Sequence, residues 1–329
     1  MDAGMTPPAG GPLFVVGAPR SGTTLMREVL RSVEAIYLLP DEFQVLREFL
    51  DAVDRGAADA DVSAAVRDSA FGFHAVDKGL WPGDAEVAEA IVEGDAASSF
   101  QRLVLLFATQ EQRTTPVFWG DKTPDNALLV RRILQIWPQA RFLHVLRDPR
   151  TTVDSMQRAW GRSVIRSAMV WRDCVAAVQE QEAVDGQSAI LTVHYADLVA
   201  TPAAVLDRVT SWLGLPGADV DFASISTGER WGSAAGLRGI SRVDDDWRSA
   251  VAPAAARRVE QICFTQMQRA GFSVELAEAP HSPSPTALRA ARVRDAAAVL
   301  RAYARERGPA SAATYKWRQH AARRRWSSL

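Results

Sequence analysis

Short, mostly apolar runs recur along the chain, and each ends in a glycine or a polar residue. Runs of four to seven residues with such an ending are typical of buried strands. The predicted strands are residues 13–17, 36–39, 141–146 and 189–195.

Amphipathic segments follow these runs. Residues 21–32 place Leu25, Val29 and Leu30 on one face of a helix, and residues 43–117 have a helical pattern with loops. Strands that alternate with helices indicate an α/β fold, a doubly wound parallel sheet flanked by helices, here with a helical insertion. The individual helices predicted are 100–110, 126–137, 151–156, 202–213 and 253–270.

The composition is that of a soluble globular protein, with 47% hydrophobic and 23% charged residues in a chain of 329. No apolar run is long enough to span a bilayer, and the N-terminal stretch MDAGMTPPAGGP lacks the features of a secretory signal. The two cysteines, Cys174 and Cys263, are far apart, and we expect reduced thiols packed in helices. These features predict a cytoplasmic protein.

Charge is distributed unevenly. Residues 281–329 contain eleven Arg and Lys against two Asp and Glu, a net charge of +9, so the rest of the chain carries −10 of the total of −1. A Pro/Ser-rich linker at 281–285 precedes an arginine-rich helix predicted at 288–307. We therefore predict one domain at 1–280 and a basic linker and helical tail at 281–329. The tail is expected to pack on the body or on a partner chain, and nucleic-acid binding is the less favoured alternative.

The stretch GAPRSGTT, residues 17–24, nearly matches the phosphate-loop pattern G-x-x-x-x-G-K-[ST]. Thr23 stands where the pattern has lysine, and Arg20 lies inside the loop. Backbone N–H groups at the start of a helix attract anions, and hydroxyl and guanidinium groups add donors. Because a P-loop kinase needs the loop lysine, ATP chemistry is disfavoured. The predicted phosphate-binding residues are Arg20, Ser21, Gly22, Thr23 and Thr24.

A second anion site is predicted in RFLHVLRDPRTTVDSM. Arg147 follows the end of a predicted strand, and Ser155 lies eight residues further on. Ligands of open α/β sheets bind at the carboxyl ends of the strands, so Arg147 is expected beside Arg20. Two separated phosphate sites suit a nucleotide with phosphates at both its 5′ and 3′ positions.

These motifs carry a family resemblance. GAPRSGTTLMREVL resembles the 5′-phosphosulfate-binding loop of sulfotransferases, and RDPRTTVDS resembles their 3′-phosphate motif. The resemblance continues through GDKTPDNALL and VHYADLVATPAAVLDRVTSWLGLP and covers about residues 13–272. It implies a P-loop-like fold and sulfuryl transfer from 3′-phosphoadenosine 5′-phosphosulfate (PAPS), which leaves adenosine 3′,5′-bisphosphate.

The resemblance also implies catalytic residues. Arg20 would neutralise the leaving phosphate, at a position where many sulfotransferases have lysine. Lys122 resembles the lysine that tyrosylprotein sulfotransferases place near the leaving group. In that branch the base is a glutamate about twenty residues after the loop, which predicts Glu42, with Asp41 in reserve and His74 as a rival among aromatic neighbours.

Three further residues each have two possible roles. Tyr195, in YADL, would contact adenine or ribose, or would be a core tyrosine. Arg238 and Arg242 lie in a glycine-rich stretch that resembles the family loop over the 3′-phosphate, or they are solvated. His144 and His194 are expected in the core. No cluster has metal-ligand spacing, and Mg²⁺ is not implied because arginine and lysine would meet the donor's charge.

The acceptor is predicted to be a small hydroxylated metabolite, with residues 43–118 shaping its pocket. A protein tyrosine is the alternative acceptor. A P-loop kinase or NTPase and a nucleotide-sensing binding module are the alternative functions.

Overall fold

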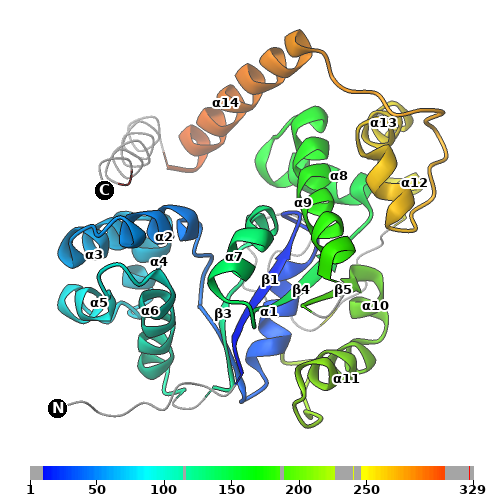
Figure 1. The fold of residues 1–329 in the computed structure, drawn as a ribbon. Coiled ribbons are helices and arrows are strands. Elements are labelled where there is room, and N and C mark those ends of the chain that lie inside the picture. Colours follow the sequence, from blue (N-terminus) through cyan, green and yellow to red (C-terminus); the bar gives the residue numbers. More distant parts are fainter. Residues whose placement is uncertain are drawn as a thin grey trace.

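The computed structural model describes residues 10–113, 116–185, 189–226, 240, 246–307 and 326. Its centre is a five-stranded parallel sheet with the strand order β2-β3-β1-β4-β5 (Figure 1). The α/β class and the four predicted strands are confirmed. The strands are β1 (Pro12–Gly17), β2 (Ile36–Leu38), β3 (Phe118–Asp121), β4 (Arg141–Leu146) and β5 (Ile190–His194).

Strand β3 is an element that the apolar pattern did not predict. Its sequence, FWGD, has only two large apolar residues, so no apolar run marks it. All four residues are nevertheless buried, because β3 pairs with β1 on one side and β2 on the other. Gly120 permits the close approach: a Cβ there would lie 2.0 Å from the Leu13 carbonyl oxygen.

Helices cover both faces of the sheet, and α2 to α6 form a helical lobe that packs against one of these faces (Figure 1). The predicted helices are present with bounds that differ by a few residues, except that the helix predicted at 126–137 is a 3₁₀ helix followed by a short α-helix. They are α1 (Thr23–Arg31), α2 (Leu46–Asp54), α3 (Asp59–Asp68), α4 (Ala70–Asp77), α5 (Asp84–Ala90), α6 (Ala96–Gln110), the 3₁₀ helix η1 (Pro124–Leu129), α7 (Val130–Ile136), α8 (Pro149–Trp160), α9 (Val164–Asp185), α10 (Tyr195–Ala200), α11 (Pro202–Leu213), α12 (Trp247–Ala250), α13 (Pro253–Arg269) and α14 (Pro285–Arg307).

Helix α9 is a 22-residue element that the sequence pattern also left unmarked. Its buried stripe includes Ala168, Trp171 and Val175, but Met169 and Val170 extend the apolar surface beyond that stripe. The helix needs this wide surface because it packs against α8, α13 and η1 together.

The alternation along β1 shows how the sheet divides the core. Phe14 and Val16 face the cluster that contains the α2–α6 lobe, α9 and α13, whereas Leu13 and Val15 face the cluster beneath α1 and α11. Burial on both faces explains why the strand reads as a continuous apolar run. Cys174 and Cys263 are buried in α9 and α13, which confirms that both cysteines pack in helices.

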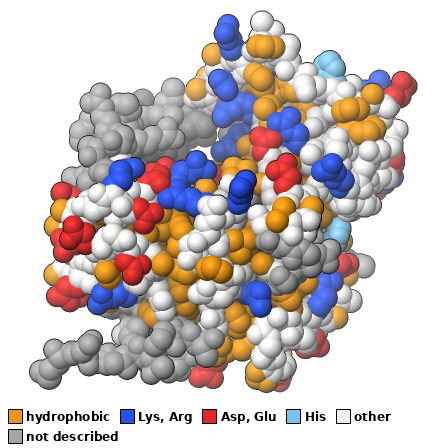
Figure 2. Space-filling model, viewed as in Figure 1, with side chains coloured by type: hydrophobic (Ala, Val, Ile, Leu, Met, Phe, Trp, Pro, Cys, Tyr) orange, Lys and Arg blue, Asp and Glu red, His pale blue; other side chains and the backbone are white. Residues whose placement is uncertain are grey.

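The predicted tail contains helix α14, which packs against α8 and α9 and, in the view of Figure 1, ends above α2. Figure 2 shows Lys and Arg side chains along α14 and Asp and Glu side chains over the lobe. No helix among the described residues is long and apolar enough to cross a membrane.

Candidate active site

The phosphate-type loop joins β1 to α1. Arg20 has φ 70° and Gly22 has φ 98°, and both values lie in the left-handed region. A Cβ on Gly22 would lie 2.4 Å from Cδ2 of Tyr195, so no other residue fits there without movement of the ring. The Ser21 N–H donates to the Ala18 carbonyl at 3.1 Å, which closes the turn before the helix.

Hydroxyl groups of this loop have contrasting environments. Ser21 is fully buried, and its Oγ has no hydrogen-bond partner among the described residues. Thr24 Oγ1 accepts a hydrogen bond from Lys122 Nζ at 3.2 Å. A buried hydroxyl without a partner is costly, and an anionic oxygen at the helix N-terminus would satisfy it. The loop therefore fits a phosphate or sulfate group.

The structure brings Arg147 and Ser155 to this loop. Arg147 Nη1 donates to the Arg20 carbonyl oxygen at 3.2 Å, and Arg20 Nε donates to Ser155 Oγ at 3.3 Å. The Arg147 guanidinium lies over the Tyr195 ring, 4.3 Å from its centroid. Two guanidinium groups, a hydroxyl and an aromatic ring thus meet where β1, β4 and β5 end.

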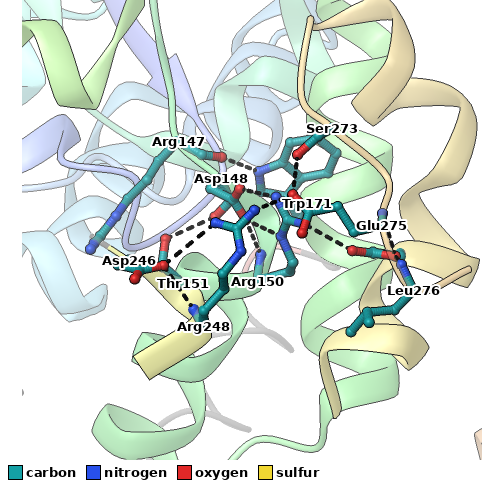
Figure 3. A network of polar contacts seen from close by, with 11 residues as sticks. Arg147, Asp148, Arg150, Thr151, Trp171, Asp246, Arg248, Ser273, Glu275 and Leu276 are labelled. Atoms are coloured by element: carbon teal, nitrogen blue, oxygen red, sulfur yellow. Dashed lines mark hydrogen bonds and ion pairs between the residues drawn. The ribbon is translucent and has the colours of Figure 1, made fainter. Parts of the chain in front are cut away.

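A buried polar network fixes the backbone that carries Arg147 (Figure 3). The Trp171 indole N–H donates to the Arg147 carbonyl oxygen at 2.9 Å, and the Asp148 side chain caps α8 by accepting from the Arg150 N–H at 2.8 Å. The Arg150 side chain is paired with Asp148 at 2.5 Å and with Glu260 at 2.8 Å.

Glu260 in α13 extends this network. Its carboxylate is fully buried and also accepts backbone N–H groups of residues 275, 276 and 277. Burial alone would lower the pKa of Arg150, but Asp148 and Glu260 outweigh it and raise that pKa. Sequence reasoning missed Arg150 and Glu260, because no motif links residues 110 positions apart.

A second cluster lies at the end of β3. The Lys122 side chain is 2% exposed, and its Nζ lies 2.5 Å from Glu42 Oε1. The adjacent Asp121 accepts from the Phe43 N–H at 3.2 Å and from the Asn126 side chain at 2.9 Å. Complete burial raises the pKa of Asp121 to about 6. Asp121 thus ties the loop that carries Glu42 to the strand that carries Lys122.

Asp41 and His74, the rival bases, contact each other. His74 Nδ1 lies 2.9 Å from Asp41 Oδ2, and Lys78 Nζ lies 3.3 Å from the same oxygen. Burial raises the pKa of Asp41, but hydrogen bonds from His74 and the Glu42 N–H, with the Lys78 charge, bring it well below its usual value. Asp41 is therefore a paired carboxylate with little tendency to take up a proton.

The remaining predicted residues have mixed outcomes. His144 is a core residue as predicted, and burial lowers its pKa to about 3, whereas His194 is only half-buried and lies against Phe272. Arg238 and Arg242 lie outside the described residues. The described part of the chain contains no group of three or more His, Cys, Asp or Glu residues that could hold a metal ion.

The comparisons with known proteins agree with the motifs. A model described as the sulfotransferase family matches residues 12–219. The sulfotransferase domain from the curacin biosynthetic pathway aligns with a TM-score of 0.55 at 16% identity, over 81% of this chain and 99% of that domain. The sulfotransferase domain of the Synechococcus PCC 7002 olefin synthase aligns with a TM-score of 0.52 at 19% identity, over 83% and 98% of the two chains. No curated protein matches this chain.

Proposed function

This chain belongs to the sulfotransferase family, and we propose that it transfers a sulfuryl group from PAPS to a hydroxyl or amine of a small-molecule acceptor. Membership of the family makes it an enzyme that transfers sulfuryl groups. The donor, the acceptor class and the roles of individual residues are the parts that we propose.

The observation that carries the proposal is the position of Lys122. Its ammonium group hydrogen-bonds Thr24 Oγ1 at 3.2 Å and pairs with Glu42 Oε1 at 2.5 Å. Thr24 belongs to the phosphate-type loop, whereas Glu42 is the predicted base. One buried cation therefore contacts both the loop that would hold the leaving phosphate and the carboxylate that would receive the acceptor's proton.

The donor's phosphates would occupy two neighbouring places. The Ser21–Thr24 loop suits the 5′-phosphosulfate, because it offers N–H groups, a helix N-terminus and the buried Ser21 hydroxyl. Arg147 and Ser155 suit the 3′-phosphate. The contact between Arg147 and the Tyr195 ring supports a nucleoside position beside that ring.

The chain's residues would promote an in-line transfer. The acceptor oxygen or nitrogen forms a bond to sulfur while the bond from sulfur to the bridging phosphate oxygen breaks. The electron pair leaves with adenosine 3′,5′-bisphosphate, and Glu42 takes the acceptor's proton. Lys122 and Arg20 stabilise the charge that develops on the leaving oxygen, which is typically the largest contribution in such reactions.

The acceptor would approach from the α2–α6 lobe. Phe73 and Val76 of α4 are 49% and 45% exposed, on the same helix as His74. Exposed apolar side chains beside a polar cluster suit an acceptor with an apolar body and one reactive hydroxyl. We propose a metabolite rather than a protein tyrosine, in a cytoplasmic setting.

Calorimetric titration of the full chain tests the donor. We expect adenosine 3′,5′-bisphosphate to bind and ATP with Mg²⁺ to bind far more weakly. Transfer from ³⁵S-labelled PAPS to a panel of hydroxylated metabolites and tyrosine peptides then tests the acceptor. Tight ATP binding without bisphosphate binding would contradict the donor, and label on peptides alone would contradict the acceptor class.

A further inference from the structure

Helix α14 lies outside the segment matched by the family model, yet it packs against the turn between α8 and α9. Asp295 of α14 is 3% exposed and accepts from the Ser163 backbone N–H at 2.9 Å and from its hydroxyl at 3.3 Å. It also pairs with Arg166 at 3.0 Å. Gly161 lies so close that a Cβ there would be 3.1 Å from the Ala298 Cβ.

The turn held by Asp295 carries the residues that support the phosphate loop. Trp160 ends α8, and the Arg20 guanidinium lies 5.8 Å from its ring centroid. Arg162 lies over the same indole at 4.9 Å. Since Arg20 also donates to Ser155 in the middle of α8, this helix contacts Arg20 at two points, of which the Trp160 ring lies next to the turn.

Asp295 is well suited to fix this turn. A buried carboxylate that accepts several hydrogen bonds has a single favourable geometry, and its removal leaves those donors unpaired. Loss of Asp295 would therefore free the turn.

We infer that Asp295 is a positioning residue for sulfuryl transfer, which holds the Trp160 turn so that Arg20 keeps its place beside the leaving phosphate. This inference rests on the proposed function, because Arg20 matters to transfer only if the loop binds PAPS. It makes the basic tail helix a working part of the active site. It also explains why a buried carboxylate stands in an otherwise arginine-rich helix.

A double-mutant cycle on the full chain tests the inference, with Asp295→Ala and Arg20→Ala measured singly and together. We expect Asp295→Ala to lower kcat/KM for PAPS about 10- to 100-fold, since small displacements of a catalytic group have effects of that size. In the Arg20→Ala background the same change should lower it less than about twofold, because Asp295 acts through Arg20. Asp295→Asn keeps one acceptor oxygen for the Ser163 N–H, so its loss should be intermediate.

Val293→Ala is the matched control, because Val293 lies on the same helix and is 72% exposed. Its kcat/KM should equal that of the wild type.

Urea unfolding midpoints show whether each variant is folded, and Asp295→Asn replaces Asp295→Ala in the cycle if the alanine variant fails to fold. If the wild type turns over PAPS, two outcomes would overturn the inference. One is that the losses in kcat/KM from Asp295→Ala and Arg20→Ala are additive, and the other is that the Asp295 variants have the wild-type rate. A wild-type chain that does not bind the bisphosphate would instead contradict the proposed function, and with it this inference.

Discussion

Lys122 and Glu42 form an ion pair of 2.5 Å between the end of β3 and the loop after β2. The Glu42 carboxylate also accepts a hydrogen bond from Gln44 at 2.9 Å, so both its oxygens are oriented. Because the lysine is buried and the glutamate is 28% exposed, the carboxylate is the member of the pair that an acceptor can reach.

Glu42→Gln is expected to lower kcat by about 10²- to 10⁴-fold, the usual contribution of a general base. Affinity for adenosine 3′,5′-bisphosphate should persist, because within the described part of the chain the Glu42 side chain bonds Lys122 and Gln44 rather than the phosphate loop. Steady-state kinetics and calorimetry measure the two quantities. Gln44→Ala is the control, and it should lower kcat much less. Full activity in Glu42→Gln would transfer the role to Asp41 or His74.

Lys122→Met is expected to lower kcat by about 10²- to 10³-fold, as loss of one preorganised charge-stabilising group does in other enzymes. Methionine fills a similar volume but cannot donate to Thr24 or pair with Glu42. Lys78→Met is the matched control, because Lys78 pairs with Asp41 and its side chain is 46% exposed. Similar losses of kcat in the two variants would mean that turnover depends on the total positive charge near the lobe and not on the position of Lys122.

Arg147→Ala is expected to weaken binding of adenosine 3′,5′-bisphosphate more than binding of adenosine 5′-phosphate. The Arg147 side chain contacts the Arg20 carbonyl and the Tyr195 ring, and Trp171 holds its backbone in place independently of the side chain. Calorimetry with the two nucleotides gives the ratio of affinities. Arg158→Ala, an exposed arginine of α8 paired with Asp154, should leave both affinities unchanged. Equal losses for both nucleotides in Arg147→Ala would exclude recognition of the 3′-phosphate.

Gly22→Ala is expected to abolish nucleotide binding. The added Cβ would lie 2.4 Å from the Tyr195 ring, and the φ of 98° is unfavourable for alanine. Gly79→Ala is a matched control, because Gly79 also has positive φ but would meet no atom within 4 Å. Both variants should lose stability in urea unfolding, by about 1 kcal/mol for the strained backbone. Only Gly22→Ala should lose the bisphosphate, and retained binding would show that the loop tolerates displacement of Tyr195.

Much of the fold was predictable because β1 and β4 are buried on both faces and are therefore continuous apolar runs. The meeting of Arg20 with Arg147 followed from the rule that parallel strands present their carboxyl ends at one edge. β3 was not predictable from its pattern, because its sequence has no apolar run. It becomes a buried strand through its pairing with β1 and β2.

The parts of the site that sequence reasoning missed are supports rather than contact residues. Glu260 and Asp295 lie on helices far along the chain from their partners Arg150 and Ser163. An isolated acidic residue in a helix ordinarily indicates a solvated surface, and only packing reveals a buried carboxylate. Local motifs therefore predicted groups that the structure brings together at the phosphate-type loop, whereas tertiary packing determined what holds them.

Asp121 provides a prediction on pH. Its pKa is about 6 in the folded chain, because of burial, against an ordinary value near 3.8 when the chain is unfolded. At pH values between these two the unfolded chain has released a proton that the folded chain retains, so the free energy of unfolding falls as the pH rises. The two pKa values differ by about two units, so the full fall, from well below the lower pKa to well above the higher one, amounts to about 3 kcal/mol, of which about 2 kcal/mol is expected between pH 4 and pH 7.

Asp121→Asn isolates this effect, because asparagine does not titrate and can still accept from the Phe43 N–H. Urea unfolding of the two proteins between pH 4 and pH 7 gives the difference in their free energies of unfolding. The wild type should lose stability relative to the variant as the pH rises through this range, and the difference should level off above about pH 6. A difference that is constant with pH would mean that Asp121 is already ionised in the folded protein at pH 4, and that Lys122 compensates fully for its burial.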